Sequence, residues 1–137
     1  LVTNDREIVV ARMQTNVWWK DFPANRDQFL ASLGKGKQIQ EVEQELIELV
    51  DEHFKGEHAV LAGNSIHSDR SFIKKYMPAL DLKLHYRMLD VTTLKIIMQG
   101  KFNYEYEKDT PHRAFDDIQA SIAELQHYLE RLQDNES

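Results

Sequence analysis

The sequence contains no cysteine among its 137 residues. The chain can therefore form no disulfide bond, no thiolate zinc site and no cysteine nucleophile. No apolar run reaches the roughly 18 residues that a membrane-spanning helix needs. The first residues, LVTNDREIVV, also lack the basic and apolar regions of a signal peptide. The lack of a membrane span and of a signal peptide favours a cytoplasmic or organellar setting, with cytoplasmic as the prediction, whereas the absence of cysteine does not itself fix the compartment.

The chain also lacks an excess of positive charge. Its formal net charge is −6 at pH 7, whereas a surface that holds long nucleic acid needs a broad basic field. A short anionic substrate held by metal ions is compatible with this charge. Because 42% of the residues are apolar, the length predicts a single domain, residues 1–137, with one core.

Apolar residues follow strand and helix periods in alternation along the chain. A hairpin is predicted at the start, where LVT and IVV flank the polar turn NDRE, and its first strand is expected to begin before residue 1. The short apolar runs HAVLAG (58–63) and YRMLDV (86–91) predict buried strands. Helical patterns occupy residues 25–33, 39–54, 70–77, 92–99 and a final segment after Pro111. This alternation predicts an α/β layered fold, in which ligands gather at the carboxyl ends of strands.

The final helix opens with PHRAFDDIQ, which has two interpretations. In one, Thr110 is the N-cap, Pro111 is the first helical residue, and Asp116 and Asp117 interact with the positive helix end. In the other, the same stretch is catalytic. A histidine with an ordinary pKa of about 6.5 accepts a proton at neutral pH, and carboxylates bind divalent cations.

Three stretches, taken in order, resemble one family: AGNSIHSDRSFIKKYMPAL (62–80), HYRMLDVTTLK (85–95) and HRAFDDIQASIAEL (112–125). Together they are similar to oligoribonucleases, which are 3′–5′ exonucleases of the DEDDh group. The resemblance is close from residue 62 onward and loose before it. It implies a ribonuclease H-like mixed sheet flanked by helices, and metal-dependent hydrolysis of very short RNA to mononucleotides.

The resemblance also implies roles for individual residues. Asp69 and Asp117 match two of the four acidic residues that hold two divalent ions, Mg²⁺ or Mn²⁺, and His112 matches the histidine that takes a proton from the attacking water. Two such ions supply the charge neutralisation that phosphodiester hydrolysis needs. The alternative for Asp69 is that it caps the following helix, with Ser68 as a competitor. Asp116 is interpreted as a solvated or capping neighbour.

Substrate contacts follow from the same resemblance. A cap on the 5′ phosphate of the RNA would use four side chains: Ser65, Arg87, Thr92 and Thr93. Guanidinium and hydroxyl groups suit phosphate, although Thr92 could instead cap the helix that it starts. Trp19 is a candidate for stacking on a base, with a core or interface role as the alternative. The family forms homodimers, across which Tyr86 could act.

One expected motif is absent. The family's first strand ends in a DxE pair that supplies two metal ligands, and the chain has no such strand. Asp5 and Glu7 have the right spacing but fall in the predicted hairpin turn. The sequence is thus interpreted as a fragment lacking the first strand or as a degenerate relative, and this chain is expected to bind a second ion poorly.

Three functions remain open at this point. The first is an oligoribonuclease-type exoribonuclease. The second is a related DEDDh nuclease that acts on tRNA ends or DNA. The third is a catalytically silent nucleotide-binding or dimerisation module, which the absent DxE motif motivates.

Overall fold

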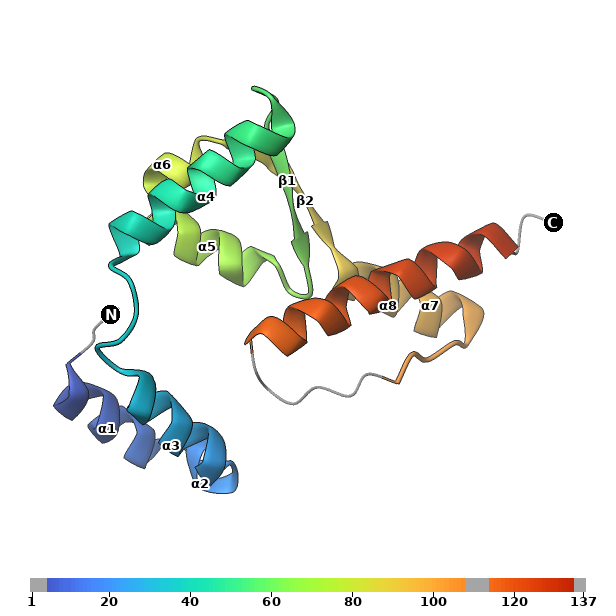
Figure 1. The fold of residues 1–137 in the computed structure, drawn as a ribbon. Helices are drawn as coiled ribbons and strands as arrows, with labels where there is room; N and C mark the ends of the chain where they lie inside the picture. The colour runs from blue at the N-terminus through green and yellow to red at the C-terminus, as the bar shows by residue number, and fades with distance from the viewer. Residues whose placement is uncertain (1–4, 108–113, 135–137) are drawn as a thin grey trace. The chain divides into compact units, whose positions relative to one another are not determined.

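The computed structural model describes residues 5–107 and 114–134, which belong to two compact units (Figure 1). Unit 1 covers residues 1–38 and unit 2 covers residues 39–137. The single domain expected from the length stays a prediction. Each unit is described by itself below.

Unit 1 is helical where a hairpin was predicted. It contains α1 (Arg6–Thr15), α2 (Trp18–Asp21) and α3 (Pro23–Ser32). The carboxylate of Asp5 accepts hydrogen bonds from the backbone N–H groups of Glu7, at 3.0 Å, and Ile8, at 3.2 Å. This N-cap satisfies amides at the helix start that would otherwise lack partners, and the apolar residues IVV therefore lie in α1 rather than in a strand. The predicted hairpin is wrong over the described residues, and Asp5 and Glu7 are not turn residues.

Unit 2 contains the predicted alternation of strands and helices. Its elements are α4 (Ile39–Phe54), β1 (Ala59–Gly63), α5 (His67–Tyr76), α6 (Pro78–Asp81), β2 (Leu84–Asp90), α7 (Val91–Phe102) and α8 (Ala114–Asp134). Pro78 separates α5 from α6, because proline fits the first turn of a helix and not its interior. The α/β fold class is confirmed.

The two strands of unit 2 form a parallel pair. Ala59 lies opposite Leu84 and Gly63 lies opposite Asp90, with an irregularity between Ala59 and Leu61. Parallel strands bring their carboxyl ends to the same edge of a sheet. The turn after β1 and the start of α7 therefore meet at this edge (Figure 1).

The strands are less buried than predicted. Ala59 and Leu84 are buried, but Val60 is 50% exposed and Tyr86 is 74% exposed. Over the described residues the sheet consists of these two strands alone, so each strand has an unpaired outer edge. A continuous apolar run becomes buried only when neighbouring elements cover it.

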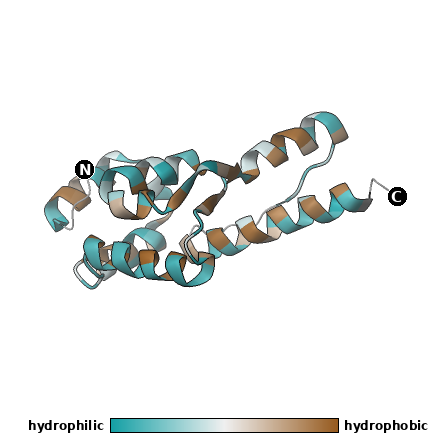
Figure 2. Ribbon diagram, turned by 90° about the horizontal axis from the view of Figure 1, so that it is seen from above, coloured by the Kyte–Doolittle hydropathy of each residue, from teal (hydrophilic) through white to brown (hydrophobic). Residues whose placement is uncertain are grey.

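The core of unit 2 lies between α7 and α8. Val91 and Met98 of α7 and Tyr128 of α8 are each only 1% exposed, and Leu125 and Tyr104 are among the half-buried residues that pack against them. Figure 2 shows apolar residues recurring along α8, the helix that leads to the C-terminus.

The rest of the apolar stripe of α8 is less well covered. Phe115 is 70% exposed and Ile118 is 57% exposed. The amino-terminal half of α8 thus presents apolar side chains that no described residue buries. None of the helices over residues 5–107 and 114–134 combines the length and the hydropathy needed to cross a bilayer.

Candidate active site

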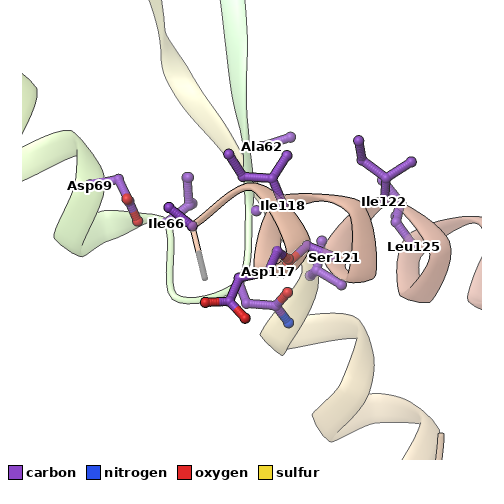
Figure 3. A pocket seen from close by; sticks show the side chains of 12 residues that line it. Ala62, Ile66, Asp69, Asp117, Ile118, Ser121, Ile122 and Leu125 are labelled. Carbon is purple, nitrogen blue, oxygen red and sulfur yellow. The ribbon is translucent and has the colours of Figure 1, made fainter. Parts of the chain in front are cut away.

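A hollow of about 640 Å³ lies where the end of β1, the start of α5 and the amino-terminal half of α8 meet (Figure 3). We call it the β1–α8 hollow. Its lining residues are Ala62, Gly63, Asn64, Ile66, Asp69, Val91, Ala114, Asp117, Ile118, Ser121, Ile122 and Leu125. Most of this lining is apolar, and two carboxylates interrupt it. Such a combination is typical of small-molecule sites.

Asp69 belongs to the first turn of α5 and lines this hollow. The N-cap position of α5 is Ile66, which makes no side-chain capping hydrogen bond, and both Ser68 and Asp69 lie inside the helix. The interpretation of Asp69 or Ser68 as the cap is therefore wrong. The carboxylate of Asp69 is exposed in the first turn of the helix, where the dipole favours negative charge.

Arg70 holds this part of α5 in place. Its Nη1 donates a hydrogen bond to the backbone carbonyl of His85 on β2, at 2.7 Å. Its Nε lies 2.6 Å from Oδ1 of Asp81 on α6. Because both side chains of this ion pair are only 18% exposed, the pair is shielded from solvent and fixes the start of α5 against the sheet.

Asp117 contributes the second carboxylate from α8. Its Oδ1 atom is buried and has no hydrogen-bond partner among the described residues. Its backbone carbonyl accepts a hydrogen bond from Oγ of Ser121, at 2.8 Å. A buried carboxylate oxygen without a partner costs free energy, and a bound cation would remove that cost. Figure 3 shows Asp69 and Asp117 coming from different elements.

The carboxylates present are therefore suitable ligands for a divalent cation, although they are few. Hard oxygen donors are the ligands that Mg²⁺ and Mn²⁺ prefer. Over residues 5–107 and 114–134, no group of three or more acidic or histidine side chains comes close enough to hold a metal ion. The metal-binding role of Asp69 and Asp117 therefore stays a prediction.

Beside the hollow, the turn after β1 is joined to the start of α7. Ser65 has a φ of 49°, and its backbone N–H donates to Oδ1 of Asp90, at 2.9 Å, and to Oγ1 of Thr92, at 3.0 Å. The hydroxyl oxygens of Ser65 and Thr92 lie 3.4 Å apart. The structure therefore brings these two predicted substrate-binding residues together.

The N-cap of α7 is Asp90. Its Oδ1 accepts a hydrogen bond from the backbone N–H of Thr92, at 3.0 Å, so the interpretation of Thr92 as the cap is wrong. Sequence reasoning missed Asp90, although an aspartate directly before an apolar helical run is itself a capping signal. Capping by Asp90 leaves the hydroxyl of Thr92 beside Ser65.

None of the predicted substrate residues of unit 2 lines the β1–α8 hollow itself, and Arg87, Tyr86 and Thr93 are also not joined to the Ser65–Thr92 pair by any described hydrogen bond. The guanidinium of Arg87 lies 5.1 Å from the centre of the Tyr86 ring, and the Tyr86 ring stacks on His85 at 4.5 Å. Thr93 is exposed in the first turn of α7. The predicted phosphate cap is thus only partly assembled in this structure.

Trp19 lies in unit 1 in an aromatic cluster. Its ring is 4.6 Å from that of Trp18, in an edge-to-face arrangement, and 5.6 Å from that of Phe29. It also lines a hollow of about 320 Å³ together with Lys20 and Arg26. Both tryptophans are half-buried, and the predicted stacking of Trp19 on a base stays a prediction.

His112 lies outside the described residues, as do Thr110 and Pro111. The catalytic and capping interpretations of this stretch both remain predictions. The description of α8 begins at Ala114, so Asp116 and Asp117 fall in its first turn.

The sequence profile of the RNase T exonuclease family matches residues 18–125, which is most of the chain. The chain belongs to this family of exonucleases. The resemblance identified from the three motifs is therefore confirmed, and with it the ribonuclease H-like fold that the family implies. The predicted classes, hydrolase, nuclease and exonuclease, are those of the family.

Individual relatives carry more specific names. An oligoribonuclease of Francisella tularensis subsp. tularensis is 47% identical over 94 residues, which cover 66% of this chain and 51% of the relative. A probable oligoribonuclease of Caenorhabditis elegans is also 47% identical over 94 residues, which cover 67% of this chain and 49% of the relative. The chain thus spans about half the length of the curated relatives that it matches.

Proposed function

We propose that the protein is a metal-dependent 3′–5′ exoribonuclease that converts very short RNA to mononucleotides. One observation carries the proposal: Asp69 and Asp117 line the same hollow. The hydrogen-bonded hydroxyls of Ser65 and Thr92 belong to residues that directly follow two of its lining residues, Asn64 and Val91. Carboxylates for a cation and hydroxyls for a phosphate therefore occur at the same edge of the strand pair. The oligoribonuclease relatives support the choice of short RNA as substrate.

In this proposal Asp69 and Asp117 hold divalent ions, Mg²⁺ or Mn²⁺. Two such ions, when bound, neutralise charge on the entering and leaving oxygens and lower the pKa of water. The lack of a hydrogen-bond partner for Oδ1 of Asp117 within the described part of the chain supports its role as a ligand. The other two acidic ligands expected in the family would have to come from a DxE pair, which Asp5 and Glu7 do not provide, because they start α1 instead of ending a strand.

Ser65, Thr92, Thr93 and Arg87 would bind the 5′ phosphate. The backbone N–H groups of Ser65 and Thr92 already donate to Asp90, so the hydroxyls and the guanidinium are the groups available for an anion. Binding of the substrate through one terminal phosphate suits a chain with a net charge of −6, since long nucleic acid would be repelled. Trp19 would stack on a base.

His112 would take the proton from the attacking water. His112→Ala should therefore lower turnover far more than it lowers affinity for a dinucleotide. Unchanged turnover would remove His112 from this role.

We also propose a cytoplasmic homodimer in which Tyr86 approaches the partner's substrate.

The deciding experiment compares a dinucleotide with an RNA of about twenty nucleotides in the presence of Mn²⁺. The protein would be tested alone and joined to the segment of the Francisella tularensis relative that precedes the aligned region. We expect faster hydrolysis of the dinucleotide by the joined protein, and loss of that hydrolysis in Asp69→Asn. The chain alone should hydrolyse poorly, because two carboxylates bind metal weakly.

Two other results would contradict the proposal. Preference for the longer RNA, for tRNA ends or for DNA would indicate a related nuclease. Metal-independent binding of the dinucleotide without hydrolysis in both proteins would indicate a silent nucleotide-binding module.

A further inference from the structure

Glu124 of α8 is buried, with only 1% of its surface exposed. Removing a carboxylate from water is costly unless hydrogen bonds replace the lost hydration. The catalytic residues proposed above do not include Glu124. Its partners therefore indicate what it contributes.

Glu124 joins α8 to the turn after β1. Its Oε2 accepts a hydrogen bond from Nδ2 of Asn64, at 3.0 Å, and its Oε1 accepts one from the hydroxyl of Tyr128, at 2.9 Å. Asn64 immediately precedes Ser65 and lines the β1–α8 hollow. The carboxylate thus connects the protein core to the turn that carries a predicted phosphate ligand.

The same helix carries Asp117. Glu124 follows Asp117 by seven residues, which is about two helical turns, so both side chains lie on one face of α8. Two chemical functions are therefore linked through one rigid element. The candidate metal ligand is on α8, and the candidate phosphate ligand is on a turn held to α8 by Glu124.

We propose that Glu124 is a positioning residue that fixes the Asn64–Ser65 turn against α8. It thereby sets the distance between the proposed phosphate-binding groups and the proposed metal-binding carboxylates. A fixed distance between the two ends of the site selects RNA by length, which makes Glu124 a determinant of the preference for dinucleotides. This length selection rests on the proposed function. The positioning itself does not.

The test uses Glu124→Ala, Glu124→Gln and Tyr128→Phe in the 137-residue chain. Hydrogen exchange at the Ser65 amide would be measured by NMR, with the Met98 amide of α7 as an internal reference for global opening. Glu124→Ala removes the hydrogen bond from Asn64 to Glu124, so we expect exchange at Ser65 to rise about tenfold relative to Met98. Glu124→Gln retains an oxygen for Asn64 and should stay close to wild type.

Tyr128→Phe is the matched control. It removes the hydrogen bond from the Tyr128 hydroxyl to Glu124 and leaves the Asn64 contact intact, so exchange at Ser65 should not rise relative to Met98. Asn64→Ala should also raise exchange at Ser65, and the double variant should give less than the sum of the two effects, because both substitutions break the same hydrogen bond.

Calorimetry with a 5′-phosphorylated RNA dinucleotide and Mn²⁺ gives the second readout. Glu124→Ala should lower the affinity for the dinucleotide about tenfold. The affinity for Mn²⁺, measured without RNA, should stay unchanged. Absence of binding by the wild-type chain would contradict the proposed function, and the exchange data would still decide the positioning. The positioning role of Glu124 would be overturned if Glu124→Ala left exchange at Ser65 relative to Met98 unchanged, or if Tyr128→Phe raised it equally.

Discussion

At the scale of single residues, Asp117 is the most informative side chain of the candidate site. A buried carboxylate oxygen without a partner lowers stability, and Asp117→Asn removes the charge with little change in shape. We expect the metal-free variant to melt at the same or a higher temperature, and to bind Mn²⁺ at least about tenfold more weakly. Circular dichroism melting and electron paramagnetic resonance of Mn²⁺ would measure the two effects.

Asp116 offers a matched control in the adjacent position. It is half-buried in the same turn of α8 but does not line the β1–α8 hollow. Asp116→Asn should leave Mn²⁺ binding unchanged. Equal loss of binding in both variants would show that the general charge of the helix start, not the carboxylate of Asp117, attracts the ion.

The sequence indicated part of this site. The order and spacing of three motifs singled out Asp69 and Asp117, and both line one hollow. Local patterns could not tell a cap from a ligand at Asp69, because they did not show that α5 begins at His67, two residues before Asp69. Glu124 resembled any other glutamate of an amphipathic helix, and its hydrogen bond to Asn64 joins residues sixty positions apart, which no local pattern encodes.

At the scale of elements, one side chain joins two helices of unit 2. The Oε1 atom of Glu43 on α4 accepts hydrogen bonds from the backbone N–H groups of Ala79, at 2.7 Å, and Leu80, at 3.1 Å, at the start of α6. Glu43→Ala leaves both amides without this partner. We expect a loss of about 1 kcal/mol in the free energy of unfolding of unit 2. Urea titration followed by circular dichroism would measure it, since both tryptophans lie in unit 1.

The pair of Asp51 and Lys83 provides the comparison. Asp51 lies on the same helix as Glu43, and both of its oxygens contact Nζ of Lys83, at 2.7 and 2.9 Å. These side chains are 48% and 42% exposed, so water and salt screen the pair. Asp51→Ala should lower the free energy of unfolding of unit 2 by less than about 0.5 kcal/mol. A larger loss for Asp51→Ala than for Glu43→Ala would contradict this ranking.

Helices and strands could be predicted where the hydrophobic periodicity was strong and no capping residue favoured another structure. The helix at residues 39–54 and both strands of the pair follow their patterns. The predicted hairpin failed because the carboxylate of Asp5 caps α1 and outweighs the strand preference of its valines. The prediction of buried strands failed because burial is supplied by neighbours, and an apolar run does not encode their presence.

At the scale of the whole molecule, unit 2 exposes a group of apolar side chains on two consecutive elements. The exposed members are Tyr86, Met88 and Leu89 of β2 and Ile96 and Ile97 of α7. Exposed apolar side chains that recur on neighbouring elements are a feature of interaction sites. An outer strand with unpaired backbone groups is also a template for pairing with another chain. Both properties fit the proposed homodimer.

We therefore expect the chain to sediment as a dimer at micromolar concentration, and Tyr86→Glu to convert it to a monomer. A glutamate at this 74% exposed position would place a charge in a buried apolar contact, which is costly unless the charge is paired. Leu49→Glu on α4 is the control, because Leu49 is also exposed, at 52%, but lies on another element. Analytical ultracentrifugation would distinguish the variants. A monomeric wild type would contradict the proposed homodimer, and dissociation caused only by Leu49→Glu would place the interface on α4 instead of β2.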